Sequence, residues 1–254
     1  MWDDAKALNA LAATLAVMAG VAVAAAAVHW AARRDAFAFH EVVVTTPLQR
    51  ASAPHLEAVI REELAGTFFS MDLGSARAAL ARVPWVRSVA LRRQWPHRLE
   101  VAVEEHEPLA RWGADALVSA AGETFVARHD GELPRFDGPE GYAAEMAARH
   151  ARWSATLAPL GLAIVALEVS PRGGWRVLAD RGGAPLALEL GHDDPGARLD
   201  RFAGAYARTI GALQRQGTAI GYVDLRYRNG FAARVPGFRE TGARGAAAAP
   251  RGAQ

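Results

Sequence analysis

The chain has 254 residues, no cysteine and a formal net charge of +2. Without cysteine, disulfide frameworks, catalytic thiolates and cysteine-bound zinc are excluded. Acidic and basic residues are interspersed rather than gathered in blocks, so the charge pattern gives no sign of a nucleic-acid surface.

The chain opens with an apolar stretch, because residues 7–28 contain no charged side chain. As a helix, the stretch would span about 33 Å, enough to cross the ~30 Å hydrocarbon core of a bilayer. Trp30 follows where an interfacial aromatic ring is expected. We therefore predict one transmembrane helix over residues 7–32, after a short head of residues 1–6.

Two alternatives exist for this stretch, a cleaved signal peptide and a buried core helix. The uncharged run is longer than the apolar part of an ordinary signal peptide, and a core helix is rarely alanine-rich on every side. A retained anchor is therefore the better interpretation. Charge alone does not give its orientation, because Lys6 precedes the stretch whereas Arg33 and Arg34 follow it.

The region after the anchor predicts three strands and two helices, in the order β-α-α-β-β. A β-branched run at 39–45 predicts the first strand. Helices are expected after Ser52 and after Asp72, and the second ends at Pro84. Two strands follow over 86–92 and 97–104, and the latter alternates apolar and polar residues as a half-buried strand does.

From Leu109 onward, the sequence pattern predicts short strands and glycine-rich turns. Two short strands are expected on either side of Gly122, followed by a helix over 142–160 and a strand over 162–170. A hairpin surrounds Gly182 and Gly183. One long helix begins after Asp193, because apolar residues recur every three or four positions as far as Leu213.

Two final strands are expected over 219–227 and 231–235. Asn229 and Gly230 stand between them, and this dipeptide favours a tight hairpin turn. The tail, residues 237–254, is rich in glycine, alanine and arginine, which predicts disorder.

No group of residues has the spacing of a catalytic or metal site. The eight histidines are scattered, and neither a serine nucleophile elbow nor a phosphate loop is present. His192, Asp193 and Asp194 are best interpreted as a helix cap. Glu104 and Glu105 point to opposite faces of a strand, so they do not form an acid–base pair. We therefore expect a binding or scaffolding protein without enzymatic activity, metal or cofactor.

Four segments carry a specific resemblance. Residues 83–89 read Val-Pro-Trp-Val-Arg-Ser-Val, and residues 92–99 read Arg-Arg-Gln-Trp-Pro-His-Arg-Leu. Residues 105–112 read Glu-His-Glu-Pro-Leu-Ala-Arg-Trp, and residues 222–227 read Tyr-Val-Asp-Leu-Arg-Tyr. In this order they resemble the signatures of the bacterial FtsQ/DivIB cell-division family, from the anchor to about Pro236.

The resemblance implies an α+β fold with a single N-terminal transmembrane helix. A POTRA domain of the β-α-α-β-β type would occupy residues 37–106. A β-rich domain with an antiparallel sheet and two long helices would follow over residues 107–236. Trp85 and Trp95, which belong to the POTRA signature, are expected to pack within that domain.

The resemblance also implies a function, that of a non-enzymatic scaffold of the inner membrane at the division septum. Its N-terminus would be cytoplasmic and its C-terminal region periplasmic. It would bind FtsB and FtsL, and other divisome proteins through the POTRA domain, and thereby help to control septal peptidoglycan synthesis. No nucleic acid or small-molecule substrate is implied.

The family's partner-binding edge carries over to the last strand and the turn before it. The expected contact residues are Arg172 on an earlier loop, then Arg226, Tyr227, Asn229, Gly230, Phe231 and Val235. FtsB would add a strand to the free edge formed by residues 231–235. Family members often have an aromatic residue where this chain has Val235.

Two other classes of protein share some of these features. POTRA domains also occur in envelope assembly and secretion factors, but the roughly 125 residues after Trp112 are too few for the barrel of such proteins and include two long helices. An envelope enzyme is disfavoured because neither a nucleophile nor a metal site is evident.

Overall fold

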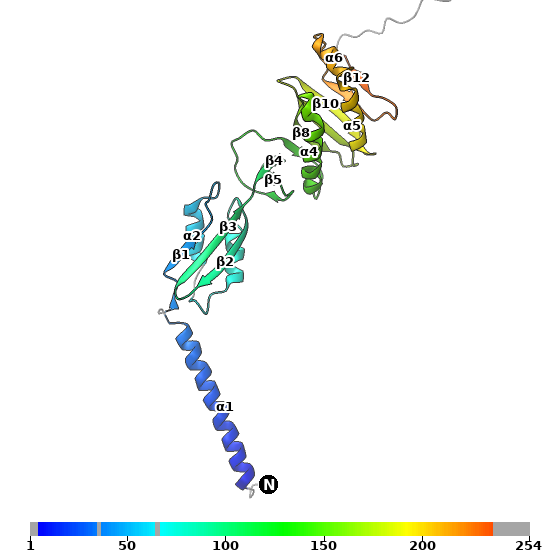
Figure 1. Ribbon diagram of the computed structural model, residues 1–254. Helices are drawn as coiled ribbons and strands as arrows, with labels where there is room; N and C mark the ends of the chain where they lie inside the picture. Colours follow the sequence, from blue (N-terminus) through cyan, green and yellow to red (C-terminus); the bar gives the residue numbers. More distant parts are fainter. Residues whose placement is uncertain (1–4, 35–36, 64–66, 236–254) are drawn as a thin grey trace, which may run out of the picture. The chain divides into compact units, whose positions relative to one another are not determined.

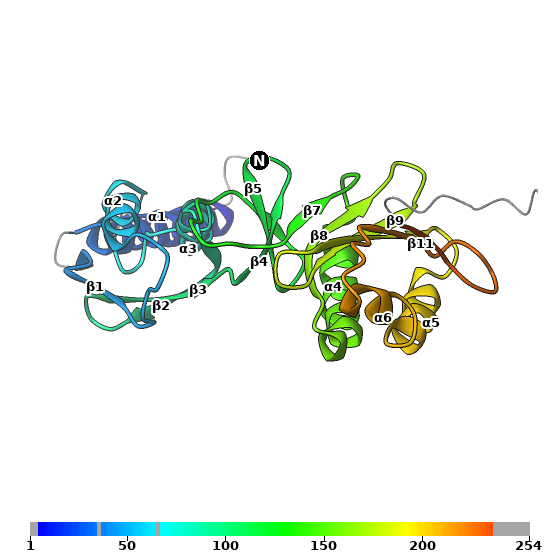
Figure 2. The same cartoon turned by 90° about the horizontal axis from the view of Figure 1, so that it is seen from above.

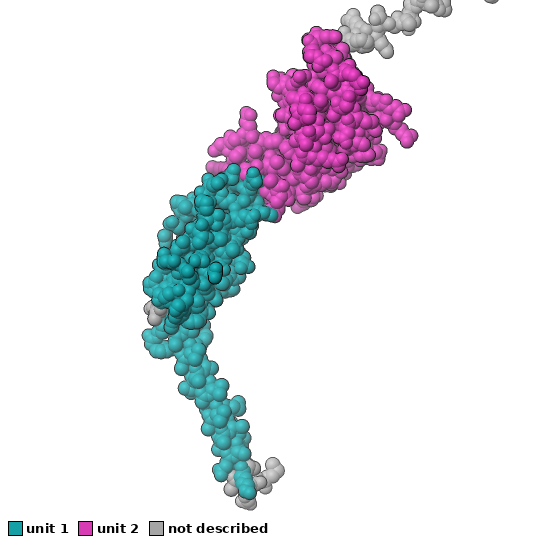
Figure 3. Space-filling view, viewed as in Figure 1, with its two compact units in different colours: residues 1–107, 125–127 teal, residues 108–124, 128–254 magenta. Residues whose placement is uncertain are grey.

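The computed structural model describes residues 5–34, 37–63 and 67–235. The predicted disordered tail, residues 237–254, and most of the predicted head lie outside the described residues. The chain divides into two compact units, drawn in different colours in Figure 3. The first comprises residues 1–107 with 125–127, and the second comprises residues 108–124 with 128–254. Each is described by itself below.

The first unit begins with one long helix, α1 (Ala5–Ala32), visible in blue in Figure 1. Its part from Leu8 to Ala32 has a mean hydropathy of 2.3, and its side chains are not buried against the rest of the protein. At 28 residues it is about 42 Å long, so it exceeds the thickness of a hydrocarbon core. Length and composition therefore make α1 a candidate membrane span.

The remainder of the first unit has the element order β-α-α-β-β. Its elements are β1 (Glu41–Val44), α2 (Ala53–Glu63), α3 (Leu73–Leu80), β2 (Val86–Gln94) and β3 (Arg98–Glu105). The sheet order is β1-β3-β2, with β1 parallel and β2 antiparallel to β3. This is the α+β arrangement that the sequence predicted.

Local chemistry explains these elements. Leu99, Val101 and Val103 alternate along β3 and are fully buried or nearly so, as a half-buried strand requires. The Asp72 carboxylate caps α3 by accepting from the Gly74 amide at 2.8 Å. At the other end of the unit, Glu105 accepts hydrogen bonds from three successive backbone amides, those of residues 49–51. This carboxylate therefore holds the loop before α2 against the end of β3.

The two signature tryptophans are less buried than expected. Trp85 is half-buried, has a φ of +74° and packs edge-on against Phe125, with ring centroids 5.5 Å apart. A positive φ is costly for a bulky residue and persists only where the surroundings hold it. Trp95 contacts Phe68 but remains 61% exposed. The prediction that it packs within the domain is therefore wrong for most of its ring.

The second unit is built on a nine-stranded sheet, whose order is β12-β11-β10-β9-β8-β7-β4-β5-β6. In chain order the strands are β4 (Pro108–Trp112), β5 (Ala116–Ser119), β6 (Thr124–Phe125), β7 (Arg135–Asp137), β8 (Ala163–Val169), β9 (Trp175–Asp180), β10 (Pro185–Gly191), β11 (Tyr222–Asp224) and β12 (Ala232–Arg234). Hairpins join neighbours such as β8 and β9, but β7 is parallel to β4 and β8, and β11 is parallel to β10. The sheet is therefore mixed rather than antiparallel throughout.

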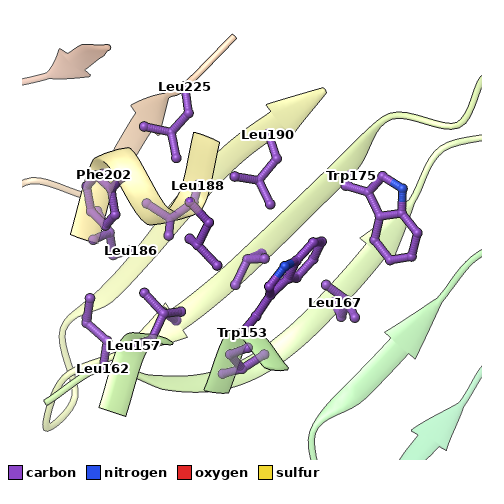
Figure 4. Close-up of a cluster of buried hydrophobic side chains, with 14 of the residues drawn as sticks. Trp153, Leu157, Leu162, Leu167, Trp175, Leu186, Leu188, Leu190, Phe202 and Leu225 are labelled. Carbon is purple, nitrogen blue, oxygen red and sulfur yellow. The ribbon is translucent and has the colours of Figure 1, made fainter. Parts of the chain in front are cut away.

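Helices cover one face of this sheet. Figure 2 shows α4 (Ala143–Leu157), α5 (Pro195–Tyr206) and α6 (Ile210–Arg215) on the same side of the strands β8 to β11. A short 3₁₀ turn, η2 (Ala158–Leu160), ends α4. Beneath them, Trp153 and Trp175 meet edge to face at 5.4 Å among buried leucines (Figure 4). The core of the unit thus lies between the helices and the sheet.

Two local predictions for this unit are wrong. The single helix expected from Asp193 to Leu213 is broken into α5 and α6, because Thr209 leaves the helical conformation and Gly211 lies directly against Tyr206. The tight turn expected at Asn229-Gly230 is instead a longer loop between β11 and β12. A two-residue type I′ turn requires a positive φ at both central residues, but the φ of Gly230 is not positive.

Candidate functional site: the C-terminal edge of the sheet

The strand β12 ends the nine-stranded sheet, and within the described residues it pairs only with β11. The Ala187 amide donates to the Gly221 carbonyl oxygen, and the Leu225 amide donates to the Glu189 carbonyl oxygen. The residues that flank β11 therefore direct their backbone groups toward β10, and so does Val223 between them. The alternate ones, Tyr222 and Asp224, therefore turn toward β12. Ala233, opposite Val223, consequently directs its N–H and C=O away from the sheet.

The side chains of this edge strand alternate between two faces. Phe231, Ala233 and Val235 pack partly against the core, and Phe231 meets Phe202 of α5 edge to face at 5.7 Å. Arg234 is exposed and lies over the ring of Tyr222, 5.5 Å from its centroid. One face therefore holds β12 in place, while its outer backbone has no partner strand within the described residues.

A buried carboxylate organises the loop that follows β11. Asp224, only 8% exposed, accepts from the Arg226 guanidinium at 2.7 Å (Nη2 to Oδ2) and 2.9 Å (Nε to Oδ1). It also accepts from the Arg226 backbone amide at 3.0 Å. These hydrogen bonds hold the pKa of Asp224 below its usual value and raise that of Arg226. The Arg226 guanidinium, which is charged at any physiological pH, is therefore held in a defined direction.

The stem of Arg226 rests on Gly191, the last residue of β10. A Cβ atom added at Gly191 would come within 3.1 Å of Arg226 Cγ and 2.9 Å of Arg198 Nη1. Arg198 is held there because it donates to the carbonyl oxygen of Leu190 at 2.6 Å. Its charge also lowers the pKa of Asp224. The absence of a side chain at Gly191 thus leaves space for two arginines beside one carboxylate.

The structure brings together five of the seven predicted site residues. Arg226, Tyr227, Asn229 and Gly230 are exposed on the loop, Phe231 leads into β12, and Tyr227 is 57% exposed. Arg172 lies in the turn that joins β8 to β9, at the same end of the sheet, but β10 and β11 lie between that hairpin and β12. Val235 stands beyond the opposite end of β12.

Sequence reasoning missed Asp224, Gly191 and Arg198. Asp224 belongs to the quoted Tyr-Val-Asp-Leu-Arg-Tyr segment but was given no role. Its two-residue spacing from Arg226 was the available signal, because residues i and i+2 of an extended chain share a face. No comparable signal existed for Gly191 and Arg198, which approach the loop only through the pairing of β10 with β11.

The geometry of this edge suits recognition of another chain. It offers an outward backbone amide and carbonyl, an oriented arginine and an exposed tyrosine, and both side chains are frequent in binding hot spots. Within the described residues, no group of three or more histidine, aspartate or glutamate side chains could hold a metal ion.

Comparison with known families defines the class of protein. The family described as "POTRA domain, FtsQ-type" matches residues 37–106, which contain the β-α-α-β-β part of the first unit. The family described as "Cell division protein FtsQ/DivIB, C-terminal" matches residues 110–226, from β4 to the arginine beside Asp224. The protein is thus a POTRA-containing cell-division protein with an N-terminal apolar helix.

Similar proteins match this chain over nearly its whole length. The cell division protein FtsQ of Burkholderia pseudomallei is 40% identical, over 94% of this chain and 96% of the relative. Those of Nitrosospira multiformis (37%, covering 92% and 99%) and Neisseria gonorrhoeae (34%, covering 92% and 95%) are also similar. The chain belongs to the FtsQ family, as its motifs predicted, and is a cell-division protein whose N-terminal helix has the length and composition of a membrane span.

Proposed function

We propose that this chain is a non-enzymatic, single-pass scaffold of the inner membrane that binds FtsB and FtsL in the periplasm. Through them it helps to control septal peptidoglycan synthesis, and its POTRA domain contacts other divisome proteins. The observation that carries the proposal is the edge strand β12, whose outer backbone has no partner strand within the described residues. Such an edge is a template for strand addition.

In this proposal a strand of FtsB pairs with the outer side of β12. Arg226 and Tyr227 contact it from the loop at one end, with Asn229, Gly230 and Phe231 beside them, and Val235 contacts it at the other end. Arg172 would serve only a partner segment that extends across the end of the sheet beyond β11. Because Ala233 is the strand residue whose amide faces outward, it should donate the central hydrogen bond of the interface.

The test is Ala233→Pro. Proline removes the outward N–H but leaves the pairing of Tyr222 with Arg234 and of Asp224 with Ala232 intact. A lost hydrogen bond costs about 1 kcal/mol, and the ring also hinders a partner strand. We expect affinity for purified FtsB, measured by isothermal titration calorimetry with the full-length chain in detergent, to fall about tenfold or more.

Ala233→Val is the matched control, because valine is similar in size to proline and keeps the amide. It should bind FtsB like the unsubstituted chain. Circular dichroism and melting temperature establish that both variants are folded. If a folded Ala233→Pro variant binds FtsB with undiminished affinity, the partner does not pair with β12.

A further inference from the structure

An exposed aromatic cluster lies at one end of the first unit. Five rings take part, and we call them the aromatic cap: Phe37, Phe39, Phe68, Phe69 and Trp95. Ring centroids are 5.2 Å apart for the pairs of Phe69 with Phe37 and with Phe68, and 5.4 Å apart for Phe68 and Trp95. The two outermost rings are the most exposed, Phe69 at 53% and Trp95 at 61%.

The core of the unit does not account for these two rings. The buried core between the helices and the sheet is formed by residues such as Leu56, Leu80 and Leu99, and only Phe39 of the cap packs partly against it. Large apolar side chains gathered on a surface are costly in water and mark an interaction site. The cap therefore has the character of a surface that binds an apolar or amphipathic partner outside the unit.

The chain brings the cap close to the end of the candidate membrane span. Phe37 follows Ala32, the last residue of α1, by five residues, so it cannot lie more than about 18 Å from it. In addition, the Thr67 hydroxyl donates to the Ala32 carbonyl oxygen at 2.6 Å, and Thr67 directly precedes Phe68. The cap is thus tied to the end of α1 at two points of the sequence.

Polar groups of the appropriate kind surround this junction. Arg33 and Arg34 are exposed directly after α1, and the Arg34 guanidinium lies 3.7 Å from the centroid of the Trp30 ring. Aromatic rings prefer the boundary between hydrocarbon and headgroups, and arginines beside it attract lipid phosphates. Trp30, the two arginines and the cap together therefore match the chemistry of a phospholipid surface.

We propose that the aromatic cap docks into the headgroup region of the bilayer and holds the POTRA domain against the membrane surface. The inference rests on the proposed membrane anchoring by α1. Phe69 and Trp95 insert their exposed edges between lipids, while Arg33 and Arg34 contact phosphates. The domain is then held at the membrane by two attachments, its covalent link to α1 and the cap.

The test uses the absence of cysteine from the chain. A single cysteine introduced as Phe69→Cys can carry an environment-sensitive NBD fluorophore in place of the ring. Gln49→Cys is the matched control, since Gln49 is exposed and lies far from the cap. Its backbone amide donates to the carboxylate of Glu105, which ends β3, whereas the cap lies near the start of β3 at Arg98, about 23 Å away along the strand. Each full-length chain is reconstituted into vesicles of phosphatidylethanolamine and phosphatidylglycerol, some containing a lipid with a nitroxide near the headgroup.

We expect the nitroxide lipid to quench the label at position 69 several-fold more strongly than the label at position 49. Replacing Trp95 in the Phe69→Cys chain should separate contact from mere proximity. Trp95→Ser should reduce the quenching, whereas Trp95→Phe, which keeps an aromatic ring, should preserve it.

The contrary results are distinct. Equal quenching at positions 69 and 49 in chains that float with the vesicles would overturn the docking of the cap but not the anchoring. Chains that do not float with vesicles would overturn both. Shielding of position 69 that occurs only in native membranes, and not in vesicles of purified protein, would assign the cap to a protein partner and overturn the proposal.

Discussion

At the scale of single residues, the Asp224–Arg226 pair shows how a short exposed loop can present a charge in a fixed direction. A long arginine side chain normally loses considerable conformational freedom when it binds a partner. Here the carboxylate and the amide of the same segment already restrict it. Part of the entropic cost of recognition is therefore met during folding.

Asp224→Asn tests this pair through pH. Because the pKa of Asp224 is lowered in the folded chain, its ionised form contributes stability above the usual value of 3.8, and that contribution is lost as the pH falls below it. We expect the asparagine variant to be less stable than the unsubstituted chain at pH 7, and the difference in stability to be smaller at pH 3. Urea unfolding at both pH values measures this, and a difference independent of pH would show that shape rather than charge matters.

Tyr227→Ala tests the exposed aromatic side chain of the loop. Tyr227 is 57% exposed, so its loss should change the melting temperature little. If FtsB covers the ring, its affinity should fall by about tenfold or more, as for other aromatic hot spots. Tyr227→Phe keeps the ring and is the control. Unchanged binding of a folded Tyr227→Ala chain would remove Tyr227 from the proposed interface.

At the scale of elements, patterns that depend on neighbours in the sequence were predictable. The alternation in β3 and the β-α-α-β-β order of the first unit were confirmed. The break between α5 and α6 was not foreseen, because Leu213 continues the apolar spacing and only the contact of Gly211 with Tyr206 reveals it. The parallel pairing of β10 with β11 was also missed, since it depends on the helices that connect them.

Two glycines in these helices should respond in opposite ways to alanine. A Cβ atom at Gly211 would lie 3.1 Å from the backbone oxygen of Tyr206, whereas one at Gly204 would meet nothing within 4 Å. We expect Gly204→Ala to stabilise the chain by about 0.5–1 kcal/mol through helix propensity. Gly211→Ala should destabilise it by about 1 kcal/mol, because crowding outweighs that gain. Thermal unfolding of both variants measures these changes. If both substitutions stabilise the chain, the contact between Gly211 and Tyr206 is not tight enough to oppose an added methyl group.

The candidate site was predictable only in part, for a related reason. The resemblance of residues 222–227 to the family motif indicated Arg226 and Tyr227 directly. Which amide of β12 faces outward could not be predicted, because it depends on the register across β10, β11 and β12. The exposure of Phe69 and Trp95 was likewise hidden, since a sequence does not reveal which aromatic residues a core leaves uncovered.

At the scale of the whole molecule, α1 predicts retention in the membrane, and the proposed function adds an orientation. The intact chain should stay with the inner membrane after high-salt and alkaline washing, because a predominantly apolar helix of 25 residues must leave the bilayer for release. A soluble protein beginning near Val28 would instead indicate a cleaved signal peptide. A reporter active only in the periplasm should function at the C-terminus and fail at the N-terminus, and the reverse would invert the proposed topology.

The first unit also takes residues 125–127 from beyond its boundary at residue 107. Phe125 stacks on His106 with ring centroids 4.2 Å apart and contacts Trp85. A chimera that exchanges POTRA domains between relatives at residue 107 would therefore combine one parent's Trp85 and His106 with the other parent's Phe125. We therefore expect a domain exchange with this chain to preserve its stability only if Trp85, His106 and Phe125 are transferred together.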